Sequence, residues 1–135
     1  MSNDIVDFFA GGTVGIMGWF FGGLDGFFQV LIAFTVIDYL SGLGAAYVKR
    51  EISSQIGFNG IARKVMIFFF VGIAHILDKN LLGDTQTLRT AVCLFYIGNE
   101  GISIIENADA MHIKIPQFLK GRFLKFTEHN EEKKP

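Results

Sequence analysis

The sequence is poor in cysteine and carries almost no net charge. Its one cysteine, Cys93, excludes an intrachain disulfide and a metal site built from cysteines, and its place in an apolar run predicts a small buried hydrophobe. The formal net charge is −1 at pH 7, so the chain as a whole offers no attraction to nucleic acid. No lysine or arginine precedes the first apolar stretch, which is the wrong pattern for a cleaved secretory signal. We therefore expect the apolar segments to remain in the mature protein.

Enzyme motifs are also missing from the sequence. It has no nucleophile-elbow, phosphate-loop or HExxH pattern, and its closely spaced glutamates lie in a hydrophobic segment. His75 and Asp78 are three residues apart and could share a proton or bind a metal, but they have no third ligand nearby. An ordinary interfacial pair is the favoured interpretation. These absences argue against an enzyme and against a bound cofactor or metal.

Apolar residues, in contrast, fill half of the 135 positions and include 15 phenylalanines. A helix needs about 20 such residues to cross the hydrocarbon core of a bilayer. Three segments come close to this length, at about 26–48, 65–83 and 90–106. We predict an all-α integral membrane protein with one membrane domain over residues 26–126.

The segments between and after these runs are polar. Residues 50–64 read as a polar loop with room for a short interfacial helix, and residues 80–89 as a turn. Residues 116–126 begin with Pro116 and place apolar side chains opposite basic ones, which predicts an amphipathic helix on the membrane surface. Residues 127–135 are polar enough to form a disordered tail.

The N-terminal segment, residues 1–25, is rich in glycine and leaves two alternatives open. Residues 8–24 contain no ionisable group. Four of their glycines, together with the glycine at position 26, recur at helical spacing and would share one face of a helix. Such a face lets two helix backbones approach closely, which favours a packed membrane helix and a total of four spans. The alternative is a flexible interfacial segment, because glycine is a poor helix former, and three spans. The glycines concerned are Gly11, Gly15, Gly18, Gly22 and Gly26.

Basic residues predict the orientation of the chain in the membrane. They gather between the first two apolar segments and after the third, and the positive-inside rule places both of these regions in the cytoplasm. We therefore expect a multi-pass protein of the bacterial cytoplasmic membrane with a cytoplasmic C-terminus. The interfacial bases are Lys49, Arg50, Arg63, Lys64, Lys120, Arg122 and Lys125.

Polar side chains also lie inside the apolar segments. The first segment has a small, polar face at Thr35, Asp38, Gly42 and Ala45, and the third has a polar stripe that begins at Tyr96. A carboxylate near the bilayer centre costs about 2.5 to 3.5 kcal/mol on insertion scales, so such residues face a bundle interior or water. The candidate pore or assembly residues are Asp38, Ser41, His75, Asp78, Asn99, Glu100, Ser103, Glu106 and Asn107.

Counting possible partners for the carboxyl groups suggests self-association. We expect His75 to be the only base within the membrane, so Asp38, Glu100 and Glu106 cannot all be neutralised by ion pairs within one subunit. The acids are then either protonated and hydrogen-bonded between helices, or ionised and lining water. Both arrangements favour a homo-oligomer. The alternative is that the polar groups only join helices in an inert bundle.

Two stretches of the sequence resemble the toxin secretion/phage lysis holin family. Residues 37–64 carry one part of the match, with Asp38, Gly42 and Ala46 followed by a loop with Ser53, Ser54, Gly57, Gly60 and Lys64. Residues 96–119 carry the other, a pattern that runs from Asn99 and Glu100 through Ser103, Glu106 and Asn107 to Pro116. The chain departs from the family in lacking a glycine between Asn107 and Pro116, and in its longer glycine-rich N-terminal segment.

The resemblance implies host-cell lysis by a phage or the secretion of a toxin. Family members form oligomeric lesions in the cytoplasmic membrane, so the implied partners are other copies of the chain and the lipid bilayer. An endolysin or exported toxin would be a functional partner without direct contact. Two other functions remain open from the residues alone: a small ion-coupled carrier in which Asp38, His75 and Glu100 relay protons, and a structural membrane scaffold.

Overall fold

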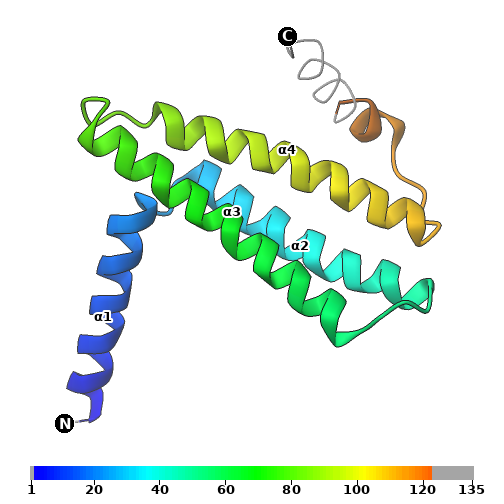
Figure 1. Ribbon diagram of the computed structural model, residues 1–135, viewed down its shortest axis with the longest axis horizontal. Coiled ribbons are helices and arrows are strands. Elements are labelled where there is room, and N and C mark those ends of the chain that lie inside the picture. Colours follow the sequence, from blue (N-terminus) through cyan, green and yellow to red (C-terminus); the bar gives the residue numbers. More distant parts are fainter. Residues whose placement is uncertain (1, 123–135) are drawn as a thin grey trace.

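The computed structural model describes residues 2–122, and these residues form an all-helical protein (Figure 1). The helices are α1 (Ser2–Phe21), α2 (Gly26–Val48), α3 (Ser54–Asn80) and α4 (Thr87–Ala110). All of them are long and apolar enough to cross a membrane. The predicted all-α fold class is confirmed, with four candidate membrane helices within the described range.

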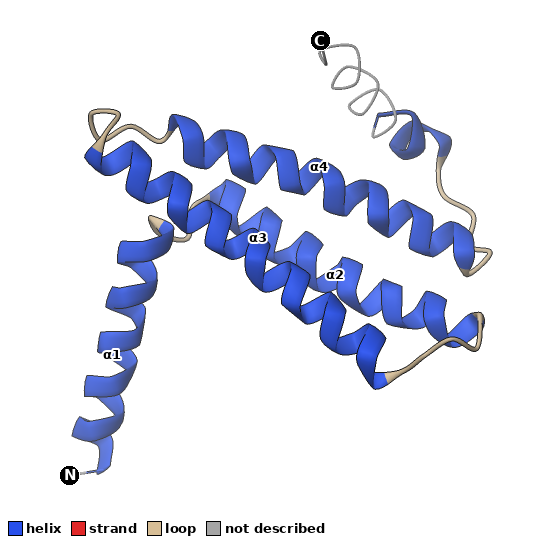
Figure 2. Ribbon diagram, viewed as in Figure 1, coloured by secondary structure: helices blue, strands red, loops and turns tan. Residues whose placement is uncertain are grey.

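Helices α2, α3 and α4 pack into a bundle, and short turns at residues 49–53 and 81–86 connect them (Figure 2). Helix α4 packs along α2 and also against α3, whereas α2 and α3 contact each other little. The core joins Phe28 and Leu31 of α2, Ile67 and Val71 of α3, and Cys93 of α4. In α2 the buried residues Phe28, Leu31, Thr35 and Asp38 recur every three or four positions, which is the spacing of one packed helix face.

Helix α3 begins well before the apolar segment predicted from residue 65. The hydroxyl of Ser53 accepts a hydrogen bond from the backbone N–H of Ile56 at 3.2 Å and caps the helix. The prediction of a polar loop with room for a short interfacial helix over residues 50–64 is therefore wrong for residues 54–64, which form the first turns of the long helix α3. Gly57 and Gly60 lie inside the helix, where a Cβ would meet the Tyr39 side chain at 3.4 and 3.2 Å. These glycines allow α2 and α3 to approach, and they do not form a turn.

Helix α1 leaves the bundle at a steep angle (Figure 1) and buries none of its residues. Its contact with the bundle is at its C-terminal end, where the ring of Phe20 lies directly over Gly72 of α3. A β-carbon at Gly11, Gly15 or Gly18 would meet no other atom within 4 Å. Within one subunit, the glycine face of α1 therefore packs against nothing in the described part of the chain.

The predicted glycine face does not continue beyond α1. Gly22 and Gly23 adopt φ angles of +81° and +100°, which end the helix and form the elbow to α2. Gly26 begins the next helix and faces open space. The expectation that Gly22 and Gly26 belong to one packing face with Gly11, Gly15 and Gly18 is wrong, because the helical spacing is interrupted at the elbow.

The described residues include only the first part of the predicted amphipathic helix at residues 116–126. Helix α4 ends at Ala110, and a further helical segment runs from residue 117 to residue 122, directly after Pro116. The rest of that predicted helix, including Lys125, and the predicted tail at 127–135 lie outside the described residues.

Candidate functional site

An ion trio joins the three bundle helices near their middle. The Lys64 ammonium of α3 donates to the carboxylate of Asp38 on α2 and to that of Glu100 on α4, each at 2.5 Å. Both acids are buried, and the Lys64 side chain is 16% exposed. The expectation that His75 is the only base within the membrane is wrong, because Lys64 pairs with two of the three acids; Glu106 has no ion pair among the described residues. Because α3 begins at Ser54, Lys64 lies within the helix and not in a loop.

The trio compensates most of the buried negative charge within one subunit. With both acids ionised its net charge is −1, and the cation lies between the two anions. Buried ions are tolerated only where they are paired and hydrogen-bonded. Lys64 therefore does for Asp38 and Glu100 what neighbouring subunits were expected to do.

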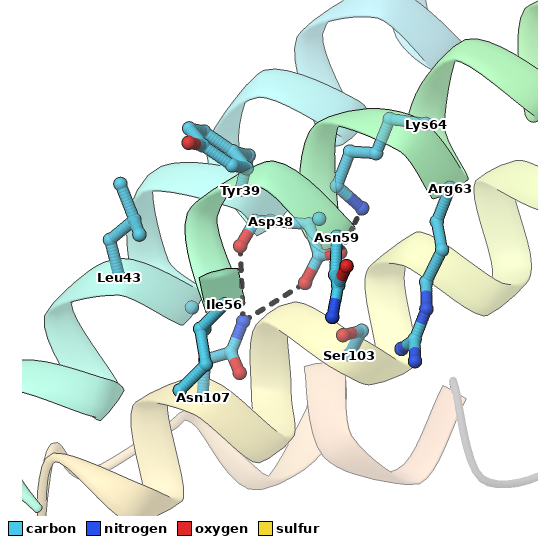
Figure 3. A pocket seen from close by; sticks show the side chains of 11 residues that line it. Asp38, Tyr39, Leu43, Ile56, Asn59, Arg63, Lys64, Ser103 and Asn107 are labelled. Atoms are coloured by element: carbon cyan, nitrogen blue, oxygen red, sulfur yellow. Dashed lines mark hydrogen bonds and ion pairs between the residues drawn. The ribbon is translucent and has the colours of Figure 1, made fainter. Parts of the chain in front are cut away.

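The polar stripe of α4 meets the small face of α2 beside the trio. The amide Nδ2 of Asn107 lies 2.9 Å from the Asp38 carboxylate, 2.9 Å from the Ser41 hydroxyl and 3.2 Å from the Asp38 backbone oxygen (Figure 3). A β-carbon at Gly42 would lie 3.6 Å from the same amide nitrogen. The small residue at position 42 thus leaves room for the amide, and Ala45 is buried one turn further along α2.

A polar cleft of about 320 Å³ opens from the trio toward the end of the bundle formed by residues 49–53, here called the α2–α3 end. Helix α2 supplies its floor, α3 supplies one wall, and Ser103 and Asn107 of α4 supply the other (Figure 3). A cleft of this volume with amide, hydroxyl and charged groups can hold several water molecules. It gives the trio a polar surrounding on one side of the bundle. The α2 and α3 residues that line it are Asp38, Tyr39, Gly42, Leu43, Ile56, Asn59, Gly60, Arg63 and Lys64.

The predicted polar stripe of α4 divides into two faces. Glu100, Ser103 and Asn107 point toward α2, α3 and the cleft. Asn99 and Glu106 are exposed, and neither forms a hydrogen bond or ion pair with another residue of the described chain. These two side chains, and not the buried acids, are the polar groups of α4 that one subunit leaves uncovered.

The predicted interfacial bases lie in different surroundings. Lys49 and Arg50 are exposed in the turn after α2, and Arg63 is exposed at the rim of the cleft. Lys120 forms an exposed ion pair with Asp109 at 3.3 Å, and Arg122 is exposed.

A second polar cluster, around Arg89, was not predicted. The Arg89 side chain is fully buried, and its guanidinium donates to Asp25 at 2.5 Å and to the backbone oxygens of Phe21 and Gly23 at 2.5 and 2.8 Å. It thereby satisfies carbonyl groups that the end of α1 leaves free, and it lies 5.5 Å from the ring centroid of Phe28. Its position at the start of an apolar segment was the available signal.

Asp25 connects this cluster to α2. Its carboxylate accepts a hydrogen bond from the Phe28 backbone N–H at 2.9 Å and so caps the helix. Burial alone would raise the pKa of Asp25, but the Phe28 hydrogen bond and the Arg89 guanidinium outweigh it and lower the pKa below its usual value. The cluster therefore holds the elbow between α1 and α2 with an ionised carboxylate.

The Asp78 carboxylate caps the start of α4 and forms no hydrogen bond with His75. Its buried carboxylate accepts hydrogen bonds from the backbone N–H groups of Leu88 and Arg89, at 3.0 and 2.8 Å. It caps α4 from a neighbouring helix, in place of Gln86, whose side chain makes no capping bond. The Nδ1 atom of His75 is buried beside the elbow and has no hydrogen-bond partner in the described chain. The predicted interfacial pair of His75 with Asp78 is thus not formed as a hydrogen bond.

The fold and these clusters define a multi-pass, all-helical membrane protein. A model of the bacteriophage holin family matches residues 15–128, and the chain belongs to that family. Members of the family are membrane proteins without enzymatic activity, so the predicted absence of catalysis is confirmed.

Related proteins come from bacteria and from a phage. An uncharacterized protein of Listeria monocytogenes is 45% identical over 87% of this chain and 83% of its own length. An uncharacterized protein of Bacillus subtilis is 32% identical over 86% of this chain and 81% of its own length. A protein of Bacillus phage phi105, described as a probable holin, is 30% identical over 79% of this chain and 78% of its own length. No solved structure matches the chain.

Proposed function

We propose that this protein is a holin that assembles in the bacterial cytoplasmic membrane and opens lesions through which an endolysin or a toxin passes. The observation that carries the proposal is the set of surfaces that one subunit leaves uncovered. The glycine face of α1 contacts nothing within the described chain, and Asn99 and Glu106 of α4 are exposed without partners there. Helices in a membrane associate through small-residue faces and polar side chains of this kind.

The ion trio has a different part in this proposal from the one expected of its acids. Because Lys64 pairs with Asp38 and Glu100 inside one bundle, a single subunit is stable in lipid and accumulates without opening the membrane. Association of several subunits then covers the α1 and α4 faces. When enough copies have gathered, the polar clefts and the exposed polar side chains line water.

The proposed topology places the α2–α3 turn and the C-terminus in the cytoplasm. The bases that follow α2 and α4 support this orientation by the positive-inside rule. With α1 crossing the membrane as well, the N-terminus is also cytoplasmic. Two-sided labelling of single cysteines at Ser2 and Thr85, in a Cys93→Ser background, tests this arrangement.

A second candidate function is an ion-coupled carrier, and the polar cleft that ends at the trio is the observation in its favour. A relay through His75 is less well supported, because His75 lies eleven residues from Lys64, about 16 Å along the same helix. A carrier passes selected small ions, whereas a holin lesion passes large solutes.

The size of the released solute separates these functions. We would reconstitute the purified protein into phosphatidylethanolamine and phosphatidylglycerol vesicles that contain calcein and a protein-sized dextran. Release of both, together with oligomers detected by crosslinking, is the expected result. A protein that remains monomeric and releases neither would refute the proposal, and flux of small ions alone would favour the carrier.

A further inference from the structure

We propose that Arg63 of one subunit forms an ion pair with Glu106 of the neighbouring subunit, and that this contact sets how copies of the chain join. The inference rests on the self-assembly proposed above and specifies its interface. Two exposed charges of opposite sign, Arg63 on α3 and Glu106 on α4, carry the argument.

Arg63 is a charged side chain without a partner among residues 2–122. It is exposed on α3 at the rim of the polar cleft, next to the fully engaged Lys64. Among the described residues it makes no hydrogen bond or ion pair. Asn59, one turn away, is exposed on the same side of α3 and lines the same cleft. An unpaired guanidinium at this depth is unfavourable in lipid and requires a polar partner.

Glu106 is the matching anion on α4. It is exposed, it has no partner in the described chain, and Asn99 lies two turns away on the same face of the helix. The two faces therefore have similar composition, each with one charge and one amide, and opposite charge. A second copy of the chain, turned so that its α4 meets α3 of the first, brings the two faces together.

The depths of the two charges in the membrane agree. The Lys64 to Glu100 ion pair places these two residues at the same level of the bundle. Glu106 lies six residues beyond Glu100, about 9 Å toward the α2–α3 end. Arg63 precedes Lys64 on the same side, and its long side chain can extend toward that end as arginine does near membrane interfaces. Neighbouring subunits with the same orientation thus present the two charges at levels that one side chain can bridge.

Arg63 and Glu106 of the same subunit form no hydrogen bond or ion pair with each other. Helices α3 and α4 separate toward the α2–α3 end (Figure 1), and the polar cleft lies between them. Because the contact joins α3 of one copy to α4 of the next, it is heterologous, and it propagates into rings or open arcs. Such a repeat suits lesions of variable size. A lipid phosphate could satisfy Arg63 but would leave Glu106 without a partner.

Charge reversal tests the pair. In Arg63→Glu, two glutamates face each other across every contact, and in Glu106→Arg two arginines do. We expect each single variant to release dextran from vesicles on the order of tenfold more slowly than the unmodified protein, since like charges replace an attraction. The double variant Arg63→Glu, Glu106→Arg restores the pair and should recover release.

An equimolar mixture of the two single variants is the decisive sample. Alternating subunits place the introduced glutamate opposite the introduced arginine at one contact, and the original Arg63 opposite the original Glu106 at the next. Every contact is then complementary, and release recovers. Recovery in the double variant without recovery in the mixture would mean a pair within one subunit and would overturn the proposal. Loss confined to Arg63→Glu, with Glu106→Arg behaving normally, would indicate a lipid phosphate and would also overturn it.

Matched controls and the unmodified protein keep the outcomes distinct. Lys49→Glu and Glu51→Arg make the same charge changes in the exposed α2–α3 turn and should release dextran normally. If both single variants also release it normally, this inference fails while the proposed function stands. If the unmodified protein releases no dextran, the proposed function fails. The amount of each variant in the vesicles, measured after flotation, excludes a failure of insertion, and crosslinking reports assembly separately from release.

Discussion

Replacing Lys64 by methionine is the most direct test of the ion trio. Methionine keeps an unbranched side chain of similar length but removes the charge, so the carboxylates of Asp38 and Glu100 are left close together and uncompensated in the bundle. Breaking a buried ion pair by removing one partner costs about 3 to 5 kcal/mol. Lys64 is 16% exposed on its side chain, so little of this cost is screened by solvent. At about 1.4 kcal/mol per tenfold, the unfolding equilibrium shifts by roughly 10² to 10³ or more.

Equilibrium unfolding in mixed detergent micelles measures this shift at neutral pH. The exposed Lys79, near the end of α3, supplies the control, since Lys79→Met should leave the free energy of unfolding within about 0.5 kcal/mol of the original. The triple variant Lys64→Met, Asp38→Asn, Glu100→Gln removes the charges together and should recover most of the lost stability. If Lys64→Met unfolds as the unmodified protein does, the trio does not hold the three helices together and the reasoning is refuted.

Further predictions concern the elbow, the α1 contact and the α4 cap. Because folding lowers the pKa of Asp25 from 3.8, its carboxylate stabilises the folded protein at pH values above 3.8, and this stabilisation is lost as the pH falls through the folded-state pKa. The Asp25→Asn variant should therefore lack this acid-induced loss of stability. Gly72→Leu should displace the ring of Phe20 and cost about 1 to 3 kcal/mol in detergent unfolding, whereas Gly15→Leu should leave subunit stability unchanged and reduce crosslinked oligomers. A Gly15→Leu variant that assembles normally would argue against the α1 face. Asp78→Ala should lower the free energy of unfolding by about 1 to 3 kcal/mol, because it leaves the first turn of α4 uncapped. Amide hydrogen exchange at Leu88 should become faster. An unchanged exchange rate at Leu88 would contradict this prediction.

Helix α2 was the easiest to predict. Helix α2 is uninterrupted by charges except at Asp38, and its observed bounds, Gly26–Val48, coincide with the predicted segment. Helix α3 was predicted too short, because hydropathy alone assigns Arg63 and Lys64 to water. The position of Lys64 depends on two acids that are 26 and 36 residues away in the chain, and local sequence has no access to such a partner.

The same limit explains the residues that were missed. Asp78 caps a helix that begins after a turn, and Arg89 closes an elbow formed 64 residues earlier, so their roles appear only when α1, α3 and α4 meet. The stripe on α4 was predicted by its spacing, but spacing cannot tell which of its members face α2 and which stay exposed. The residues that face α2 and the residues that stay exposed are of similar types, and they differ only in whether a neighbouring helix lies in front of them.

The amino-acid sequence by itself determined that this chain is helical, apolar and multi-pass. The length of an apolar run between charges is a local property, and it can be compared directly with the thickness of the hydrocarbon core of a bilayer. It also determined membership of the holin family, through residues spread along most of the chain. The tertiary structure decided which acids are neutralised within a subunit and which charges have no partner among the described residues. That distinction depends on where Lys64 and Arg63 lie relative to α2 and α4, and therefore on packing between distant segments.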